Sequence, residues 1–243
     1  FSALFRSRKD TSAFPLFPRG GTHWSGYGLK IAGDTLVRYI EHRLGYDMRD
    51  FQRRPGEVLT EPRGTDDDIA KTLNLIWAPP AYRMMYPTIE YAPLKPSQHR
   101  PNMLLIGDSF CWGFVDPFMS ESFDRQRSRF WYYDSEVAWP ENRPEGTSVA
   151  ALDRRQQYLD RDVVLVMFTE YGLFRIDHFS DLAYRLFTPY TRADSVRIRQ
   201  LEQGIARTPD LANRWWKKSA ETGLSLPDLV HQAAVAHYDS IRP

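Results

Sequence analysis

The chain of 243 residues is long enough for one large domain, or for one domain with an appended helical segment. Its formal net charge of +1 gives no electrostatic basis for binding nucleic acid, so we expect no nucleic-acid partner. A single cysteine, Cys111, excludes an internal disulfide and a cysteine-based zinc site. No apolar run approaches the roughly 18 residues that a membrane-spanning helix requires.

The N-terminal part of the sequence predicts two helices. Residues 28–45 carry apolar side chains at helical spacing, and Gly45 is a typical helix stop. Residues 65–75 predict a shorter helix with Thr65 as its N-cap. The triple Asp66–Asp68 falls in the first turn of this helix, where acidic side chains are favourable, so we interpret it as a helix start and not as a metal site.

The middle of the chain predicts strands. A loop with Pro and Arg residues follows the first helix, and the proline-rich residues 78–101 predict an edge strand or an extended crossing. The segments "NMLLI" (102–106), "RFWYY" (129–133) and "DVVLVMFTEY" (162–171) predict three further strands. Between the last two, "SVAALDRRQQYLD" predicts a helix capped by Ser148.

This order of strand, helix and strand predicts an α/β domain with parallel strands flanked by helices. From about residue 190 the sequence predicts helices alone. Thr208-Pro209 is typical of a helix start, Gly223 of a helix stop, and Ser225 of the cap of the last helix. We therefore expect an α/β domain over residues 1–189 and a C-terminal helical appendage over residues 190–243, packed on it.

Candidate site residues lie at the ends of two predicted strands. Ser109 follows "NMLLI" directly, and Glu170 and Tyr171 end "DVVLVMFTEY". Active sites of open α/β sheets lie at the carboxyl ends of their strands. A serine hydroxyl becomes a nucleophile only when a base removes its proton. The loop "FPRGGTHWSGYG" offers His23 as that base, held between glycines with Trp24 beside it.

Three other groups invite a catalytic reading that the sequence does not favour. Asp228 and His231 lie at positions i and i+3 of a predicted amphipathic helix and are better explained as a pair on its surface. His178, next to Asp177, follows the third strand without a motif around it. Cys111, two residues after Ser109, is expected to face inward as a small packed side chain.

The segments "GTHWSGYG", "TDDDIAKTLNL" and "NMLLIGDSF", in that order, resemble the AlgX/AlgJ-type SGNH-hydrolase-like proteins. The helical C-terminal segment from "RIRQLEQ" to "AVAHY" is similar to the tail of relatives that accompany membrane-bound O-acyltransferases, so the resemblance covers most of residues 17–241. It implies an SGNH-hydrolase-like fold and the addition of acetyl groups to hydroxyls of a bacterial exopolysaccharide. It implies no cofactor and no metal.

Position by position, the resemblance implies that Ser109 is the nucleophile and His23 the general base, while Asp108 shapes the turn. The sequence departs from the family at Gly21, where members with a full triad have Asp. Either another acid substitutes, with Glu170 as our candidate, or the site works as a Ser-His dyad, or the domain only binds polysaccharide. The Asn that usually contributes to the oxyanion hole is also missing near Glu170, and Thr169 or Tyr171 could replace it.

Aromatic side chains could form a platform for a sugar chain, although each could equally belong to the core. The candidates for substrate binding are Trp24, Trp112, Trp131 and Tyr171. The first functional hypothesis is a serine-dependent O-acetyltransferase acting on a cell-surface polysaccharide. The alternatives are a carbohydrate acetylesterase of the same fold and a non-catalytic polysaccharide-binding or assembly subunit.

The resemblance also sets the expected partners and location. They are a polysaccharide acceptor and an acetyl donor, the latter delivered by a membrane-bound O-acyltransferase. We expect a periplasmic protein. Because the sequence opens on Phe1 and not on Met, any membrane anchor is expected in a segment outside this chain.

Overall fold

The computed structural model describes residues 1–73, 76–77, 80–175, 179, 183, 187 and 190–241. The chain divides into two compact units, Phe1–Asp177 and His178–Pro243, and each is described by itself. The predicted domain boundary between residues 189 and 190 borders residues outside the described part. Within the described ranges, the helices are too short or too polar to cross a bilayer.

A four-stranded sheet forms the centre of the first unit. Its strands are β3 (Met103–Gly107), β4 (Arg129–Tyr132), β5 (Glu136–Trp139) and β6 (Val163–Met167), in the order β5-β4-β3-β6. Strand β3 runs parallel to both β4 and β6, whereas β5 is antiparallel to β4. The predicted parallel pairing of "NMLLI" with "DVVLVMFTEY" is confirmed, and the two strands end side by side at Gly107 and Met167.

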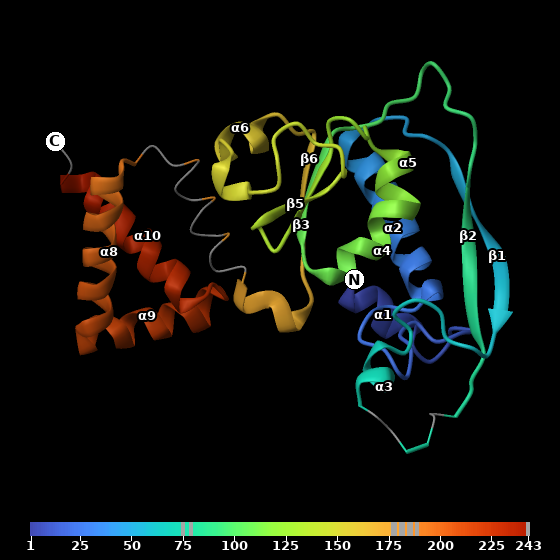
Figure 1. Ribbon diagram of the computed structural model, residues 1–243. Coiled ribbons are helices and arrows are strands. Elements are labelled where there is room, and N and C mark those ends of the chain that lie inside the picture. Colours follow the sequence, from blue (N-terminus) through green and yellow to red (C-terminus); the bar gives the residue numbers. More distant parts are fainter. Residues whose placement is uncertain are drawn as a thin grey trace. The chain divides into compact units, whose positions relative to one another are not determined.

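Helices on one face of this sheet bury its central strand. Helix α2 (Gly26–Leu44) starts where the Ser25 hydroxyl accepts a hydrogen bond from Gly28 N and ends at Gly45, whose φ of 67° suits glycine. Shorter helices α4 (Trp112–Phe114) and α5 (Ser120–Ser122) follow β3. Figure 1 shows α2, α4 and α5 between the two sheets of this unit. All five residues of β3 are buried, which requires cover on both faces because successive side chains point to opposite sides of the sheet.

The other face of the sheet meets helix α6 (Arg154–Leu159). Trp131 of β4 packs edge-on against Tyr158 of α6, with ring centroids 5.8 Å apart. The helix begins later than predicted, because Asp153, and not Ser148, accepts the capping hydrogen bond from Gln156 N. Residues of "SVAA" form a 3₁₀ turn before it.

A second, two-stranded antiparallel sheet consists of β1 (Phe51–Leu59) and β2 (Met84–Tyr91). Strand β1 falls where a loop with Pro and Arg residues was expected. The register shifts between Arg54 and Glu57, so Pro55 and Gly56 sit in an irregularity where a missing N–H breaks no pairing. Helices α1 (Ser2–Arg8) and α3 (Asp68–Thr72) complete the unit, and α3 starts three residues after the predicted cap.

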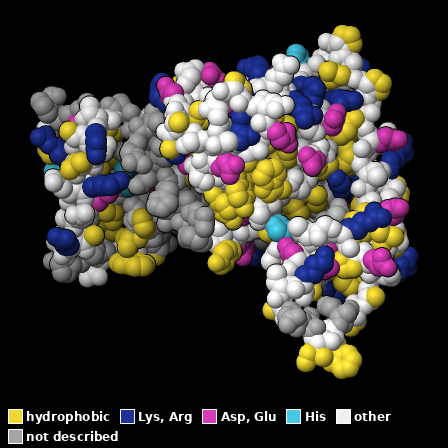
Figure 2. All heavy atoms as spheres, in the orientation of Figure 1, with side chains coloured by type: hydrophobic (Ala, Val, Ile, Leu, Met, Phe, Trp, Pro, Cys, Tyr) yellow, Lys and Arg dark blue, Asp and Glu magenta, His cyan; other side chains and the backbone are white. Residues whose placement is uncertain are grey.

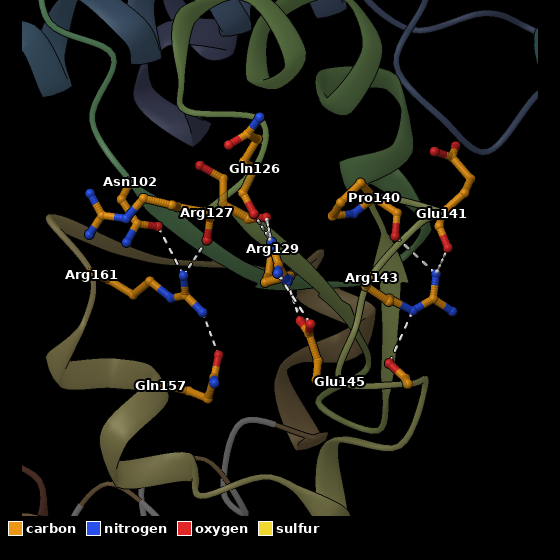
Figure 3. A network of polar contacts seen from close by, with 12 residues as sticks. Asn102, Gln126, Arg127, Arg129, Pro140, Glu141, Arg143, Glu145, Gln157 and Arg161 are labelled. Carbon is orange, nitrogen blue, oxygen red and sulfur yellow. Dashed lines mark hydrogen bonds and ion pairs between the residues drawn. The ribbon is translucent and has the colours of Figure 1, made fainter.

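Polar contacts fix the opposite ends of the strands, away from Ser109 (Figure 3). Arg161 donates to the side-chain oxygen of Asn102, just before β3, at 2.9 Å, and also to the backbone oxygen of Arg127. Arg129, at the start of β4, forms a mostly buried ion pair with Glu145. These contacts join the loops before β3, β4 and β6, and so help to hold the parallel register that brings the strand ends together.

The second unit contains helices α8 (Arg192–Arg207), α9 (Pro209–Thr222) and α10 (Leu226–Ile241). Thr191 and Asp194 form a capping box at the start of α8, and Gly223 ends α9 at a φ of 70°. Ile198, Ala234 and Tyr238 form a small core of their own. The predicted helical character of this part, with Pro209 at a helix start, is confirmed.

Candidate active site

Ser109 begins a 3₁₀ turn immediately after β3. The turn is held by Asp108, a buried residue whose carboxylate links the ends of two strands. One of its oxygens accepts from Phe110 N at 3.0 Å, and the other accepts from the backbone N–H and the hydroxyl of Thr169, both at 2.8 Å. These contacts agree with the predicted turn-shaping role of Asp108. They also commit the Thr169 hydroxyl proton, so this side chain is not the oxyanion donor that we considered.

His23 lies against Ser109 although 86 residues separate them in the sequence. The imidazole Nε2 is 2.9 Å from Ser109 Oγ. The histidine loop precedes the first turn of α2, whose capping residue Ser25 also donates to the Pro15 carbonyl at 2.6 Å. The imidazole ring lies 4.9 Å from the Phe110 ring, centroid to centroid. The loop, the helix start and the phenyl ring together fix the direction in which the imidazole points.

The second ring nitrogen of His23 meets an acid, and that acid is Asp68. His23 Nδ1 is 3.0 Å from Asp68 Oδ2. The same oxygen accepts from the Thr22 hydroxyl at 2.9 Å, while Oδ1 accepts from Thr22 N at 2.9 Å and from Ile69 N at 2.8 Å. The carboxylate is therefore fully supplied with donors, two of them from the residue next to the histidine.

This arrangement corrects two sequence-based predictions. Glu170 was our candidate for the acid, but both ring nitrogens of His23 face other partners, Ser109 and Asp68. Asp68 had been explained together with its two neighbours as a helix-start acid. The three side chains in fact diverge: Asp66 accepts from the Tyr86 hydroxyl, Asp67 pairs with Lys71, and only Asp68 reaches the histidine.

The absence of an acid at Gly21 has a steric explanation. A Cβ placed on Gly21 would lie 2.2 Å from the Thr65 carbonyl oxygen and 2.9 Å from the Asp66 carbonyl carbon. Real Cβ atoms essentially never approach other atoms so closely. The segment that carries Asp68 thus passes across the backbone of residue 21 and fills the space that the Cβ of an Asp at this position would need. The sequence signal that could have identified Asp68 was the coincidence of a missing acid at residue 21 and surplus acids at residues 66–68.

The hydrogen bonds decide how the protons are distributed. Burial opposes the ionisation of Asp68, but hydrogen bonds from Thr22, His23 and Ile69 outweigh this and lower the pKa of its carboxyl group. An ionised carboxylate can only accept, so Nδ1 of His23 carries the proton and Nε2 is left to accept from Ser109. A Ser–His–Asp chain of this kind can pass the serine proton to the imidazole while Oγ attacks a carbonyl carbon.

Ser109 and His23 open into a cleft of about 610 Å³. Trp112, on α4, lines this cleft, and its side chain packs on buried Phe130 at 5.0 Å while 43% of the residue surface stays exposed. Trp112 therefore meets the expectation of an exposed aromatic beside the serine. Trp24 also lines the cleft but is 91% buried, so it forms a wall and not a platform. Figure 2 shows hydrophobic side chains gathered on this face of the molecule.

The two other predicted substrate-binding aromatics lie elsewhere. Trp131 is completely buried between the sheet and α6, which corrects its assignment to a sugar platform. Strand alternation explains the error, because Phe130 and Trp131 point to opposite faces of a sheet that is covered on both sides. Tyr171 and Glu170 line a second cleft of about 590 Å³, which shares only the Trp24 and Phe110 wall with the first.

The groups set aside in the sequence have other partners or positions. Asp228 caps α10 together with Ser225, and His231 contacts Glu202 of α8 at 2.5 Å, so the two do not form a catalytic pair. Cys111 is fully buried, and burial raises the pKa of its thiol far above the ordinary value. His178 and Asp177 lie outside the described residues.

Comparison with known proteins gives distant similarities only. No protein-family model matches the chain, and no curated protein does. Among solved structures, the chain is similar to the O-acetyltransferase domain of AlgJ from Pseudomonas putida, with 17% identity and a TM-score of 0.36 over 68% of this chain and 56% of that one. AlgX from Pseudomonas aeruginosa gives 12% identity and a TM-score of 0.39 over 70% of this chain and 43% of that one. PatB1 from Bacillus cereus gives 12% identity and a TM-score of 0.31 over 65% of this chain and 63% of that one. In each case the chain covers less than two thirds of the other protein.

Proposed function

We propose that this chain is a serine-dependent O-acetyltransferase that acetylates hydroxyl groups of a polysaccharide. The observation that supports this most directly is the hydrogen-bonded chain from Ser109 through His23 to Asp68 at the end of the parallel strands. It combines a nucleophile, a base with a defined tautomer and an acid that orients the base. The sequence lacks an acid at residue 21, and Asp68 supplies one to His23. This supports an enzyme rather than a binding subunit.

In the proposed reaction, Ser109 Oγ attacks the carbonyl carbon of an acetyl donor while His23 Nε2 takes the serine proton. The imidazolium, stabilised by Asp68, then gives this proton to the leaving group, and an acetyl-enzyme remains. A sugar hydroxyl enters, loses its proton to His23 and attacks the acetyl carbon. This attack forms a tetrahedral intermediate, which collapses to release the acetylated sugar while His23 returns the proton to Ser109 Oγ. The backbone N–H of Ser109 is the proposed oxyanion donor.

The acceptor side of the proposal rests on the cleft beside the serine. The exposed face of Trp112 offers a flat apolar surface of the kind on which a sugar ring stacks. Water as the acceptor would make the same site an acetylesterase. The resemblance of the sequence motifs supports an acetyl donor supplied by a membrane-bound O-acyltransferase and a periplasmic location, and both belong to this proposal.

The test begins with the covalent intermediate. The protein is mixed with a chromogenic acetyl ester, quenched and examined by mass spectrometry, with acetylation of Ser109 as the expected result. Ser109→Ala and His23→Ala should abolish both the acetylated peptide and the release of chromophore. Ser135→Ala, a surface serine whose hydroxyl donates to a backbone carbonyl, is the control that should stay active.

The acceptor is identified by adding polysaccharide fragments to the acetylated protein. Transfer of acetyl to the fragments at the expense of free acetate supports the transferase, whereas unchanged release of acetate supports the esterase. Wild type and Ser109→Ala that are equally inert, together with retained binding of polysaccharide, would show that the domain is a binding subunit.

A further inference from the structure

The segment that carries the triad acid is held by one tyrosine of the two-stranded sheet. The hydroxyl of Tyr86, on β2, donates to Asp66 Oδ2 at 2.5 Å and accepts from Arg63 N at 3.1 Å. The guanidinium of Arg63 lies 5.3 Å from the centre of the Tyr86 ring. Tyr86 thus binds both ends of the tetrapeptide that directly precedes Asp67 and Asp68.

The same tyrosine also contacts the segment that carries the base. A Cβ placed on Gly26, the first residue of α2, would lie 2.8 Å from the Tyr86 ring. Gly26 follows His23 by three residues, and Ser25, which lies between the two, is the N-cap of α2. The Tyr86 ring therefore lies between the start of the helix behind the base and the loop before the acid. The distance between His23 and Asp68 depends on both of these segments.

Asp66 shows how tightly this contact is built. The residue is only 4% exposed, and burial raises the pKa of its carboxyl group although the hydrogen bond from Tyr86 acts in the opposite direction. Removing the tyrosine hydroxyl takes away one of the two hydrogen bonds, from Tyr86 and from the Arg63 backbone, that favour the ionised form of this buried carboxyl group. The loss of a donor to a buried polar group is costly, so we expect the loop to shift. Arg63 adds an ion pair with Glu57 of β1 at 2.6 Å, which ties the loop to the same sheet.

We propose that Tyr86 is a positioning residue for the triad: its hydroxyl holds residues 63–66 so that Asp68 faces His23. The β1–β2 sheet, which contributes no member to the triad, thereby supports the geometry of the site. This inference rests on the proposed function for its kinetic test, but its structural consequence can be measured without any activity. Tyr86 acts through Asp68, so its effect must disappear when Asp68 can no longer orient the imidazole.

The kinetic test is a double-mutant cycle on the acetyl ester reaction. Tyr86→Phe should lower kcat about 10- to 100-fold, the cost of a displacement of about 1 Å at a catalytic group. In the Asp68→Asn background the same change should have no further effect. Tyr91→Phe is the matched control: it lies on the same strand and its hydroxyl also makes two hydrogen bonds, but to Pro117 O and Ser122 Oγ, away from the acid. It should leave kcat unchanged.

The structural test follows the imidazole proton between His23 and Asp68 by NMR. Wild type and Tyr91→Phe should show its downfield resonance, and Tyr86→Phe should lose or broaden it. Should Tyr86→Phe not fold, Asp66→Ala removes the same contact from the other side and is expected to give the same result. An unchanged resonance in the folded variant, an unchanged kcat, or a kcat effect that multiplies with that of Asp68→Asn would overturn the inference. Equal inactivity of wild type and Ser109→Ala would instead overturn the proposed function and leave the NMR test decisive.

Discussion

An Asp introduced at residue 21, where the family that the sequence resembles has one, should damage this site and not improve it. The Cβ of Gly21→Ala or Gly21→Asp would lie 2.2 Å from the Thr65 carbonyl oxygen, where contacts under 3.0 Å essentially never occur. The segment from Thr65 to Asp68 must therefore retreat by about 1 Å, since close-packed backbone offers no other space. In the variant Asp68 would then move away from His23, whereas in the native protein Asp68 Oδ2 lies 3.0 Å from His23 Nδ1.

The expected magnitude follows from this displacement. A misplacement of about 1 Å in a catalytic constellation costs on the order of 10²-fold in rate, and overpacking of this kind costs about 1–3 kcal/mol of stability. Gly20→Ala is the matched control, because its Cβ would meet Ala70 Cβ at 3.2 Å and backbone atoms only at 3.5 Å. It should retain most of the activity.

The assay is the turnover of a chromogenic acetyl ester, with thermal unfolding measured on the same samples to separate local displacement from global unfolding. The two Gly21 variants should be folded, less stable and about 100-fold slower. A Gly21→Asp variant as active as wild type, or more active, would contradict this prediction. It would mean that residue 21 can hold the orienting acid and that the contact with Asp68 does not matter for the rate.

Three further expectations follow from the same structure. Asp68→Asn should slow ester turnover about 10²- to 10⁴-fold, whereas Glu170→Gln should leave it unchanged; the opposite ranking would restore Glu170 as the acid. Trp112→Ala should raise KM for an oligosaccharide acceptor several-fold, while Trp131→Phe should lower the melting temperature without changing KM. Equal KM values in the two variants would show that Trp112 is not a stacking surface for the sugar. Burial lowers the pKa of Lys30 to about 8, so between pH 8 and the ordinary value of 10.5 the unfolded chain holds a proton that the folded chain has released. The free energy of unfolding should therefore rise with pH across this window and the rise should vanish in Lys30→Met, which urea titrations at pH 8 and 10 will check.

Local sequence was sufficient to predict a structural element wherever a short run of residues carries a simple pattern. The apolar runs of β3 and β6 predicted parallel strands, and their shared rim followed from the α/β order. The stop at Gly45 and the proline at the start of α9 act within a few residues, so they could be predicted without the fold. The resemblance of the motifs identified Ser109 and His23, which the structure brings to 2.9 Å.

What the sequence could not determine are contacts made across the fold. Trp131 looks like a surface aromatic until α6 covers its face of the sheet. β1 contains Pro55 and Gly56, which oppose a strand locally but are accommodated by an irregular pairing with β2.

Asp68 shows the limit most clearly. Its place among three successive acids at a helix start had a sufficient local explanation, and 45 residues separate it from His23. Which of the three reaches the imidazole depends on contacts across the fold, because Tyr86 and the crossing over Gly21 fix the direction of the loop. Local sequence thus predicted strands β3 and β6 and, through the motifs of the family that it resembles, the candidate nucleophile and base. The packing of two distant loops determined the acid, since the carboxylate can hydrogen-bond to His23 only where that packing holds it.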